Sequence, residues 1–211
     1  MPTVAPAPID AVVFDIGGVL LDWDPRHLYR KLFDDEDAMN RFLEEVCTLE
    51  WHAAHDLGAP FQVSCARLAA QHPEHAELIW AWGRRSEEMV AGPIDGTVDI
   101  LRALRRRGLR CYALTNMEAE TYPRRLERYE FLRWFDGTVV SSAEGVAKPD
   151  PEIFTRLLQR FGLTAETTLM IDDNPSNVAA AAALGMPAIR FESPDQLRRR
   201  LVRAQVLAPD R

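Results

Sequence analysis

Length and composition limit the classes of protein to which this chain can belong. The 211 residues correspond to one domain, or to one domain that carries a smaller inserted module. Hydrophobic residues make up 47% and charged residues 27%, which supports a folded core and excludes disordered or collagen-like chains. The formal net charge of −7 argues against nucleic acid or an anionic membrane as the main partner, because phosphate groups are bound by excess positive charge.

The N-terminus and the cysteines indicate the compartment. Met1–Pro8 has no basic stretch followed by an apolar one, so we expect an extended lead-in there and not a signal peptide. No apolar run approaches the ~18 residues of a membrane span. Cys47, Cys65 and Cys111 are widely spaced and include no CxxC pair, which favours free thiols. We therefore expect a cytoplasmic protein without a membrane partner.

The first predicted strand, Ile9–Asp15, is followed by a long helical stretch. No further strand is expected before Arg110. Between them, apolar residues recur at helical spacing, namely Phe42, Leu43, Val46 and Leu49 in one stretch and Leu78, Ile79, Trp82 and Met89 in another. The pattern predicts a helical bundle of about four helices, inserted at residues 20–90, that covers one end of the sheet.

From residue 96 onward, short apolar runs alternate with helical patterns, which is typical of βαβ units and a parallel sheet. The predicted strands are Arg110–Thr115, Gly137–Ser141, Thr168–Asp172 and Pro187–Phe191. One helix between them begins after the N-cap Asp150 and ends at Gly162. Another begins at Asn174 and closes at Gly185. The expected fold class is α/β.

Three of the predicted strands run into a polar residue at their carboxyl end. These residues are Asp15, Thr115 and Asp172, the last of which is followed by Asp173. The carboxyl ends of parallel strands share one edge of an open sheet, and ligands bind in the crevice outside it. Clustered carboxylates repel unless a cation lies between them, and oxygen ligands with positions left for water suit Mg²⁺. Lys148, just before a predicted helix, adds a compact positive charge at the same edge.

These side chains are the parts that phosphoryl transfer to an aspartate requires. An aspartate nucleophile divides a difficult displacement into two steps through an aspartyl-phosphate. A metal ion and Lys148 would offset the charge on the phosphoryl oxygens, and Thr115 would donate a hydrogen bond to one of them. The expected partner is therefore a small phosphorylated molecule.

Four segments match, in order, the motifs of the haloacid dehalogenase-like (HAD) hydrolase superfamily. They are FDIGGVLLD around Asp15, LTN at Thr115, KPDPEIF at Lys148 and IDDNPSN at Asp172. The chain resembles this superfamily from Ile9 to about Phe191. The resemblance implies a Rossmann-like core, residues 1–19 and 91–211, with a C1-type helical cap, residues 20–90, inserted after the first motif. The DxGxV opening resembles that of a sugar-phosphatase-like branch.

The resemblance also implies roles for individual residues. Asp15 is similar to the nucleophile of the superfamily, Thr115 to its phosphate-binding hydroxyl and Lys148 to its charge-neutralising lysine. Asp15, Asp172 and Asp173 are similar to the magnesium ligands, and the backbone carbonyl of Gly17 completes the set.

Gly17 is also the one position at which the sequence departs from the pattern of the superfamily's phosphatases. They usually carry a second aspartate at this position, two residues after the nucleophile, as general acid and base. Loss of a general acid typically costs ~10²–10⁴ in rate, unless a cap residue or water takes over.

Further residues are expected to bind substrate. Asn116 and Gly18 lie in the motifs, and the backbone N–H of Asn116 could face the phosphate. Trp51, His55 and Asp56 lie in the expected cap, where the specificity residues of such enzymes occur, although each could instead pack in the interior or lie on the surface. His52 and His55 could share a helical face, but no third ligand is near in the sequence, so we do not expect a metal site there.

Three functions stay open on the sequence alone. The first is a Mg²⁺-dependent phosphatase of a small, sugar-phosphate-like metabolite. The second is a 2-haloacid dehalogenase, in which the same aspartate attacks carbon; this chemistry needs no metal, so the acidic pair at Asp172 and Asp173 argues against it. The third is a phosphometabolite-binding module that lost turnover through Gly17. The chain could be a monomer or a homodimer.

Overall fold

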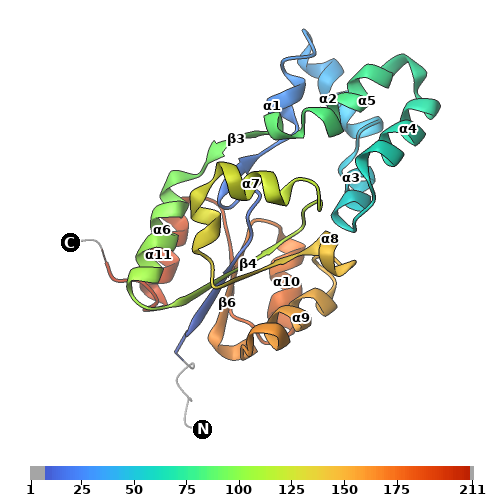
Figure 1. The fold of residues 1–211 in the computed structure, drawn as a ribbon. Coiled ribbons are helices and arrows are strands. Elements are labelled where there is room, and N and C mark those ends of the chain that lie inside the picture. The colour runs from blue at the N-terminus through green and yellow to red at the C-terminus, as the bar shows by residue number, and fades with distance from the viewer. Residues whose placement is uncertain (1–7, 210–211) are drawn as a thin grey trace.

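The computed structural model describes residues 8–209, and its centre is a five-stranded sheet in the order β5–β4–β1–β6–β7 (Figure 1). All neighbouring strands of this sheet are parallel. The strands are β1 (Ala11–Phe14), β4 (Arg110–Thr115), β5 (Gly137–Val140), β6 (Thr168–Asp172) and β7 (Ala188–Arg190). The predicted α/β class and Rossmann-like sheet are confirmed. The predicted lead-in, apart from Pro8, lies outside the described residues.

Helices cover both faces of the sheet, as βαβ connections require. On one face lie α6 (Asp95–Arg106) and α11 (Pro194–Arg203), and on the other lie α9 (Pro151–Phe161) and α10 (Pro175–Ala183) (Figure 1). Two shorter helices, α7 (Tyr122–Arg128) and α8 (Ser141–Glu144), follow β4 and β5. None of the helices formed by the described residues is both long enough and apolar enough to cross a membrane.

Residues of β1 alternate between two hydrophobic clusters because successive side chains of a strand point to opposite faces. Val12 and Phe14 belong to the cluster under α6 and α11, whereas Ala11 and Val13 belong to the cluster under α9 and α10. All four side chains are fully buried. The central strand therefore has no solvent-facing side, and its sequence is a continuous apolar run.

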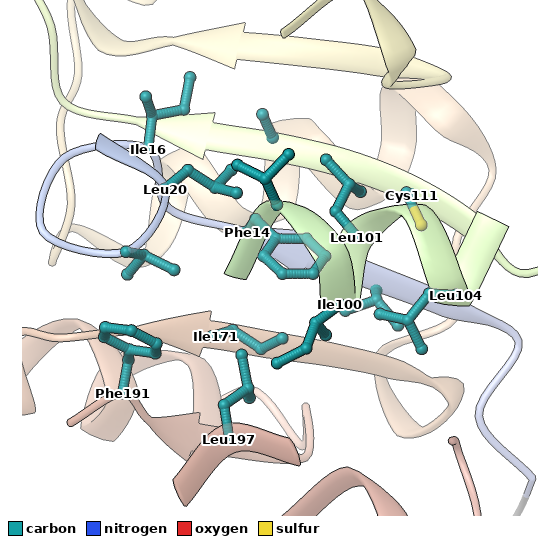
Figure 2. Packing of buried hydrophobic residues seen from close by; sticks show 14 of the residues in the cluster. Phe14, Ile16, Leu20, Ile100, Leu101, Leu104, Cys111, Ile171, Phe191 and Leu197 are labelled. Carbon is teal, nitrogen blue, oxygen red and sulfur yellow. The ribbon is translucent and has the colours of Figure 1, made fainter. Parts of the chain in front are cut away.

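Three apolar residues of α6 fix this helix on the sheet. Ile100, Leu101 and Leu104 are fully buried, and Figure 2 shows them beside Phe14 of β1, with Leu197 of α11 lower in the view. Their spacing places them on one helical stripe.

The three cysteines are free, as predicted, and all three are buried.

The predicted helix boundaries near the carboxyl edge are confirmed. The Asp150 side chain accepts a hydrogen bond from the Glu152 N–H at the start of α9, and the helix ends at Gly162, whose φ is 61°. The Asn174 side chain caps α10 by accepting from the Ser176 N–H at 2.9 Å. This helix ends at Ala183, just before the predicted Gly185.

Two short strands were missed by the sequence analysis. They are β2 (Leu21–Trp23) and β3 (Val90–Pro93), which pair antiparallel with each other. The prediction that no strand lies between β1 and Arg110 is therefore wrong. The reason is physical: strands this short show too few residues for alternation, and their partner is distant in the sequence, so no local turn marks the pair.

Between β2 and β3 lies a helical segment, residues 26–89, with five α-helices where about four were expected. They are α1 (Arg26–Tyr29), α2 (Glu36–Glu45), α3 (Leu49–Asp56), α4 (Phe61–Gln71) and α5 (Ala76–Arg84). They share a hydrophobic cluster of their own, centred on the fully buried Trp82 and Tyr29. Figure 1 shows the segment beyond one end of the central sheet. Its division from the rest as a cap at residues 20–90 stays a prediction.

Removal of a core side chain is expected to lower the free energy of unfolding. Leu101 is fully buried, so Leu101→Ala should cost about 2–5 kcal/mol because it leaves a cavity. Val63→Ala is the control, since Val63 is 64% exposed and a surface change of this kind should stay within about 0.5 kcal/mol. Urea unfolding followed by circular dichroism measures both, and equal losses would contradict the assignment of the core.

Candidate active site

A cavity of about 350 Å³ opens at the carboxyl edge of the sheet, between the strands and the helical segment. The parallel register brings the ends of β1, β4 and β6 to this edge. Its lining residues are Asp15, Gly17, Gly18, Trp23, Leu49, His52, Asp56, Asn116, Met117, Glu118, Arg125, Lys148, Asp173, Asn174 and Asn177. Residues far apart in the sequence therefore face one space.

The Lys148 ammonium lies between two carboxylates. Its Nζ is 3.0 Å from Asp15 Oδ1 and 2.7 Å from Asp172 Oδ2, and its side chain is 1% exposed. Burial by itself lowers the pKa of Lys148, but the two carboxylates outweigh it and raise this pKa above its ordinary value. Lys148 is therefore charged at neutral pH and holds both aspartates in place.

Asp15 is held by its neighbours yet remains costly to ionise. Its Oδ1 accepts a hydrogen bond from the Ile16 N–H at 2.7 Å. Burial, together with the negative charges of Asp172 and Asp173, raises the pKa of Asp15 to about 7, although Lys148 opposes the shift. A further positive charge beside Asp15 would lower this pKa and favour the ionised, nucleophilic form.

Asp172 at the end of β6 is fully buried and accepts several hydrogen bonds. The Asn174 N–H and the Asn177 side-chain amide both donate to Oδ1 at 2.9 Å, and the same amide lies 3.1 Å from Oδ2. With the bond from Lys148, both oxygens of this carboxylate accept hydrogen bonds that hold it in place. Asn177 thus positions Asp172.

Gly18 allows Asp173 to approach the loop after β1. Its φ of +71° lies in the left-handed region, and a Cβ there would come within 2.5 Å of Asp173 Oδ2. A side chain at this position would therefore displace Asp173. Burial, followed by the charge of Asp172, raises the pKa of Asp173.

Asp15, Asp172 and Asp173 form a group that fits a hard divalent cation. One carboxylate oxygen of each lies within 4.8 Å of the others. The donor set consists of oxygen atoms only and carries three formal charges against the single charge of Lys148. Asp15 and Asp172 are buried, which makes the imbalance costly for them, whereas Asp173 is exposed. The predicted fourth ligand, the carbonyl of Gly17, belongs to a residue that lines the same cavity.

Asn116 connects the β4 edge to Lys148. Its Oδ1 accepts from the Lys148 N–H and its Nδ2 donates to the Lys148 carbonyl, both at 2.9 Å. The Asn116 side chain therefore holds the Lys148 backbone, and phosphate binding by the backbone N–H of Asn116 stays a prediction. Thr115, the last residue of β4, is 1% exposed and does not line the cavity itself, so its role in phosphate binding stays a prediction.

Comparison with known proteins decides the family. The family model of haloacid dehalogenase-like hydrolases matches residues 9–185. The chain belongs to this family. It is 26% identical to a sesquiterpene phosphatase, astK, of Aspergillus oryzae over 86% of this chain and 89% of that protein. It is 24% identical to a phosphorylated carbohydrates phosphatase of Thermotoga maritima over 86% of this chain and 84% of that protein. The protein is therefore a HAD family hydrolase with phosphatase homologues.

Solved structures share the fold. A HAD family enzyme of Bacteroides thetaiotaomicron, in complex with magnesium and inorganic phosphate, superposes with a TM-score of 0.66 at 20% identity over 88% of this chain and 95% of that one. A dehalogenase superposes with a TM-score of 0.69 at 19% identity over 87% of this chain and 85% of that one. At these identities the likeness supports the HAD fold alone.

Two of the residues expected to bind substrate lie away from the cavity of this HAD hydrolase. His55 is fully buried and its ring packs 4.4 Å from that of Phe61, centroid to centroid. Trp51 is partly buried and stacks edge-on against Trp82 at 5.5 Å. Both side chains belong to the packing of the helical segment. The residues of α3 that line the cavity are Leu49, His52 and Asp56, which follow one another at intervals of about one helical turn.

The side of the cavity opposite β1 carries charged and polar residues, of which the sequence analysis named only Asp56 as a possible specificity residue. Glu118 and Arg125 come from the segment after β4, and His52 and Asp56 come from α3. The i, i+4 spacing of His52 and Asp56 places them on one helical face, which is the only sequence signal that could have paired them. We call His52, Asp56, Glu118 and Arg125 the roof cluster.

A hydrogen bond from Trp82 fixes the tautomer of His52. The indole Nε1–H can only donate, and it lies 3.2 Å from His52 Nδ1, so this nitrogen accepts. The proton of the neutral imidazole is therefore on Nε2, which faces Glu118 Oε1 at 3.3 Å and Asp56 Oδ1 at 4.0 Å. Burial lowers the pKa of His52, which agrees with a neutral ring. Although His52, Asp56 and Glu118 have the spacing of a metal site, an Nε2 that carries a proton is no metal ligand.

Arg125 brings a buried positive charge to the same side. It is 4% exposed and lines the cavity, and within residues 8–209 its Nε has no hydrogen-bond partner. A buried donor without a partner costs about 1–3 kcal/mol, and more when charged. A buried polar group without a partner in the protein calls for an explanation, and a bound ligand can supply one.

Replacement of Lys148 should expose the repulsion between the aspartates. In the metal-free protein, Lys148→Met should lower the free energy of unfolding by about 3–5 kcal/mol at pH 8, because it leaves two buried carboxylates unpaired. The loss should be smaller at pH 5.5. The pKa of Asp15 is already raised to about 7 and would rise further, so the folded state binds more protons than the unfolded state and stability falls as pH rises through this range.

The matched control for this experiment is Lys31→Met, since the Lys31 ammonium forms an exposed ion pair with Glu88 at 2.9 Å. It should cost less than about 1 kcal/mol at both pH values. Urea unfolding in EDTA measures each variant, and a pH-independent loss for Lys148→Met would contradict the proposed charge balance.

Proposed function

We propose that the protein is a Mg²⁺-dependent phosphatase of a small phosphorylated metabolite that works through an aspartyl-phosphate on Asp15. The observation that carries this proposal is the buried ammonium of Lys148, 3.0 Å from Asp15 Oδ1 in a cavity that also faces Asp173. A nucleophilic carboxylate beside a fixed cation is what attack on a phosphoryl group needs, since both the nucleophile and the target are anionic. The phosphatase relatives support the same reaction.

In this reaction Asp15 attacks phosphorus, and Lys148 donates hydrogen bonds to a phosphoryl oxygen as charge moves onto it. Asn116 keeps Lys148 in place through its paired hydrogen bonds. Mg²⁺, held by Asp15, Asp172, Asp173 and the carbonyl of Gly17, would offset negative charge on the phosphoryl group when bound. Thr115 is proposed to donate a hydrogen bond to the phosphate.

We also propose that the helical segment acts as a cap that excludes water from the cavity during phosphoryl transfer. The cavity supports this role, because Leu49, His52 and Asp56 on one side come from the segment and Asp15 and Lys148 come from the sheet side. A sugar-phosphate-like substrate would fit a cavity of about 350 Å³ with polar walls.

The expected test is hydrolysis of p-nitrophenyl phosphate with and without Mg²⁺. Wild-type protein should release phosphate, EDTA should abolish release, and Asp15→Asn should lower kcat by at least about 10³, as loss of a nucleophile does elsewhere. Glu50→Gln, an exposed change on α3, is the control and should leave kcat unchanged. Metal-dependent turnover that persists in Asp15→Asn would contradict the nucleophile assignment.

The same preparations separate the two alternative functions. A dehalogenase would release chloride from a 2-haloacid in EDTA and hydrolyse no phosphate ester. A binding module would bind inorganic phosphate, measured by calorimetry, without turnover of any ester. Either result would replace the phosphatase proposal.

Arg125 supports a finer specificity, in which the substrate carries a second anionic group. Phosphoglycolate and ethyl phosphate have the same two-carbon skeleton and differ in a carboxylate. A charge-assisted hydrogen bond contributes about 1.5–3 kcal/mol, so Arg125→Met should lower kcat/KM for phosphoglycolate roughly 10- to 150-fold. Ethyl phosphate should change less than about threefold, and its turnover shows that the variant is folded. Equal losses on both esters would mean that Arg125 only stabilises the fold.

A further inference from the structure

The loop after β1 offers no acid for the leaving group. Gly17 stands two residues after Asp15 and has no side chain that could carry a proton. Lys148 is held between Asp15 and Asp172, and Arg125 does not deprotonate in proteins. Among the described residues that line the cavity outside the Asp15 group, the remaining proton carriers are His52, Asp56 and Glu118.

Hydrogen bonds through Ser141 tie the backbone of Asp56 to the loop after β4. The Ser141 hydroxyl donates to the Asp56 carbonyl at 2.5 Å and accepts from the Met117 N–H at 3.1 Å. Met117 directly follows the Asn116 that holds Lys148. Two residues beyond Asp56, a Cβ on Gly58 would lie 3.3 Å from the Ser142 carbonyl, so the end of α3 lies close to α8. The end of α3 is thus tied to the same loop that positions the lysine, and the Asp56 side chain is left to face the cavity.

The neighbours of Asp56 favour its protonated form. The Asp56 side chain is 15% exposed, and no hydrogen bond to its carboxyl is found within residues 8–209. The Nε2–H of His52 lies nearer to Glu118 Oε1, at 3.3 Å, than to Asp56 Oδ1, at 4.0 Å, so Glu118 and not Asp56 is the nearer partner of this donor. Burial and the charge of Glu118 raise the pKa of Asp56 to about 7, against the opposing charges of Lys148 and Arg125.

We propose that Asp56, on the helical segment, is the general acid and base that takes the place of the side chain missing at Gly17. This assignment rests on the proposed phosphatase function. Asp15 attacks phosphorus and the bond to the ester oxygen breaks, while the carboxyl proton of Asp56 moves to that oxygen to give a neutral alcohol. The Asp56 carboxylate then takes a proton from the water that attacks phosphorus, and the bond to Asp15 breaks to release phosphate.

The test compares leaving groups in Asp56→Asn, which keeps the size of the side chain and the backbone carbonyl that Ser141 holds. For ethyl phosphate, whose leaving alkoxide needs a proton, kcat/KM should fall about 10²–10⁴-fold. For p-nitrophenyl phosphate, whose leaving group departs as a stable anion, kcat/KM should fall less than about tenfold. The second step then lacks its base, so nitrophenolate should appear as a burst of one equivalent per enzyme followed by slow turnover.

Two variants make the outcome specific to Asp56. Glu50→Gln on the same helix should leave both esters unchanged, and thermal unfolding shows that all variants are folded. Equal losses on both esters in Asp56→Asn would overturn the acid role and leave the phosphatase function intact. A leaving-group-dependent loss in Glu118→Gln and not in Asp56→Asn would also overturn it, because the proton would then come from Glu118. A wild-type protein that hydrolyses neither ester with Mg²⁺ would overturn the proposed function itself.

Discussion

The buried ion pair of Lys148 with Asp15 and Asp172 is the interaction on which the site depends. Three carboxylates meet within 4.8 Å at the end of the sheet, two of them buried, and one lysine cannot balance three negative charges. Burial first, and the charges of the neighbouring aspartates after it, raise the pKa values of Asp15 and Asp173. The unbalanced charge lowers the stability of the folded protein at this edge. The same charge favours binding of a further cation and keeps a reactive carboxylate in the site.

The fold meets this cost with hydrogen bonds that come from several elements. Asn177 of α10 and the Asn174 N–H hold Asp172, the amide of Asn116 after β4 holds the Lys148 backbone, and Gly18 leaves room for Asp173. Each of these residues directly follows or faces the end of a strand. Since β1, β4 and β6 are neighbours in a parallel sheet, rigidity of the sheet passes directly to the charged groups.

Sequence patterns predicted the parts of this structure that depend on local interactions. The five strands of the central sheet, the Asp150 and Asn174 caps and the polar residues at the strand ends are encoded by nearby residues. The edge rule for parallel sheets then brings distant strand ends together. The roof cluster could not be predicted in the same way. His52 owes its tautomer to Trp82, and Asp56 its position to Ser141, and both contacts join segments that helical periodicity cannot orient relative to each other. Because the sequence does not show how α3 is rotated relative to the sheet, His55 was expected at the cavity, whereas the structure places Asp56 there.

The position of the roof cluster has a consequence for how catalysis and closure are connected. In an in-line displacement the leaving oxygen lies opposite the attacking one, so a group attacked by Asp15 directs its leaving oxygen away from the end of β1. An acid two residues after the nucleophile would reach the leaving oxygen from the loop after β1. The proposed acid Asp56 would reach it from the helical segment. Protonation of the leaving group would then occur only while α3 is docked on α8 through Ser141. Such an arrangement would couple water exclusion to acid catalysis, because docking of α3 on α8 would also bring the Asp56 carboxyl to the leaving oxygen.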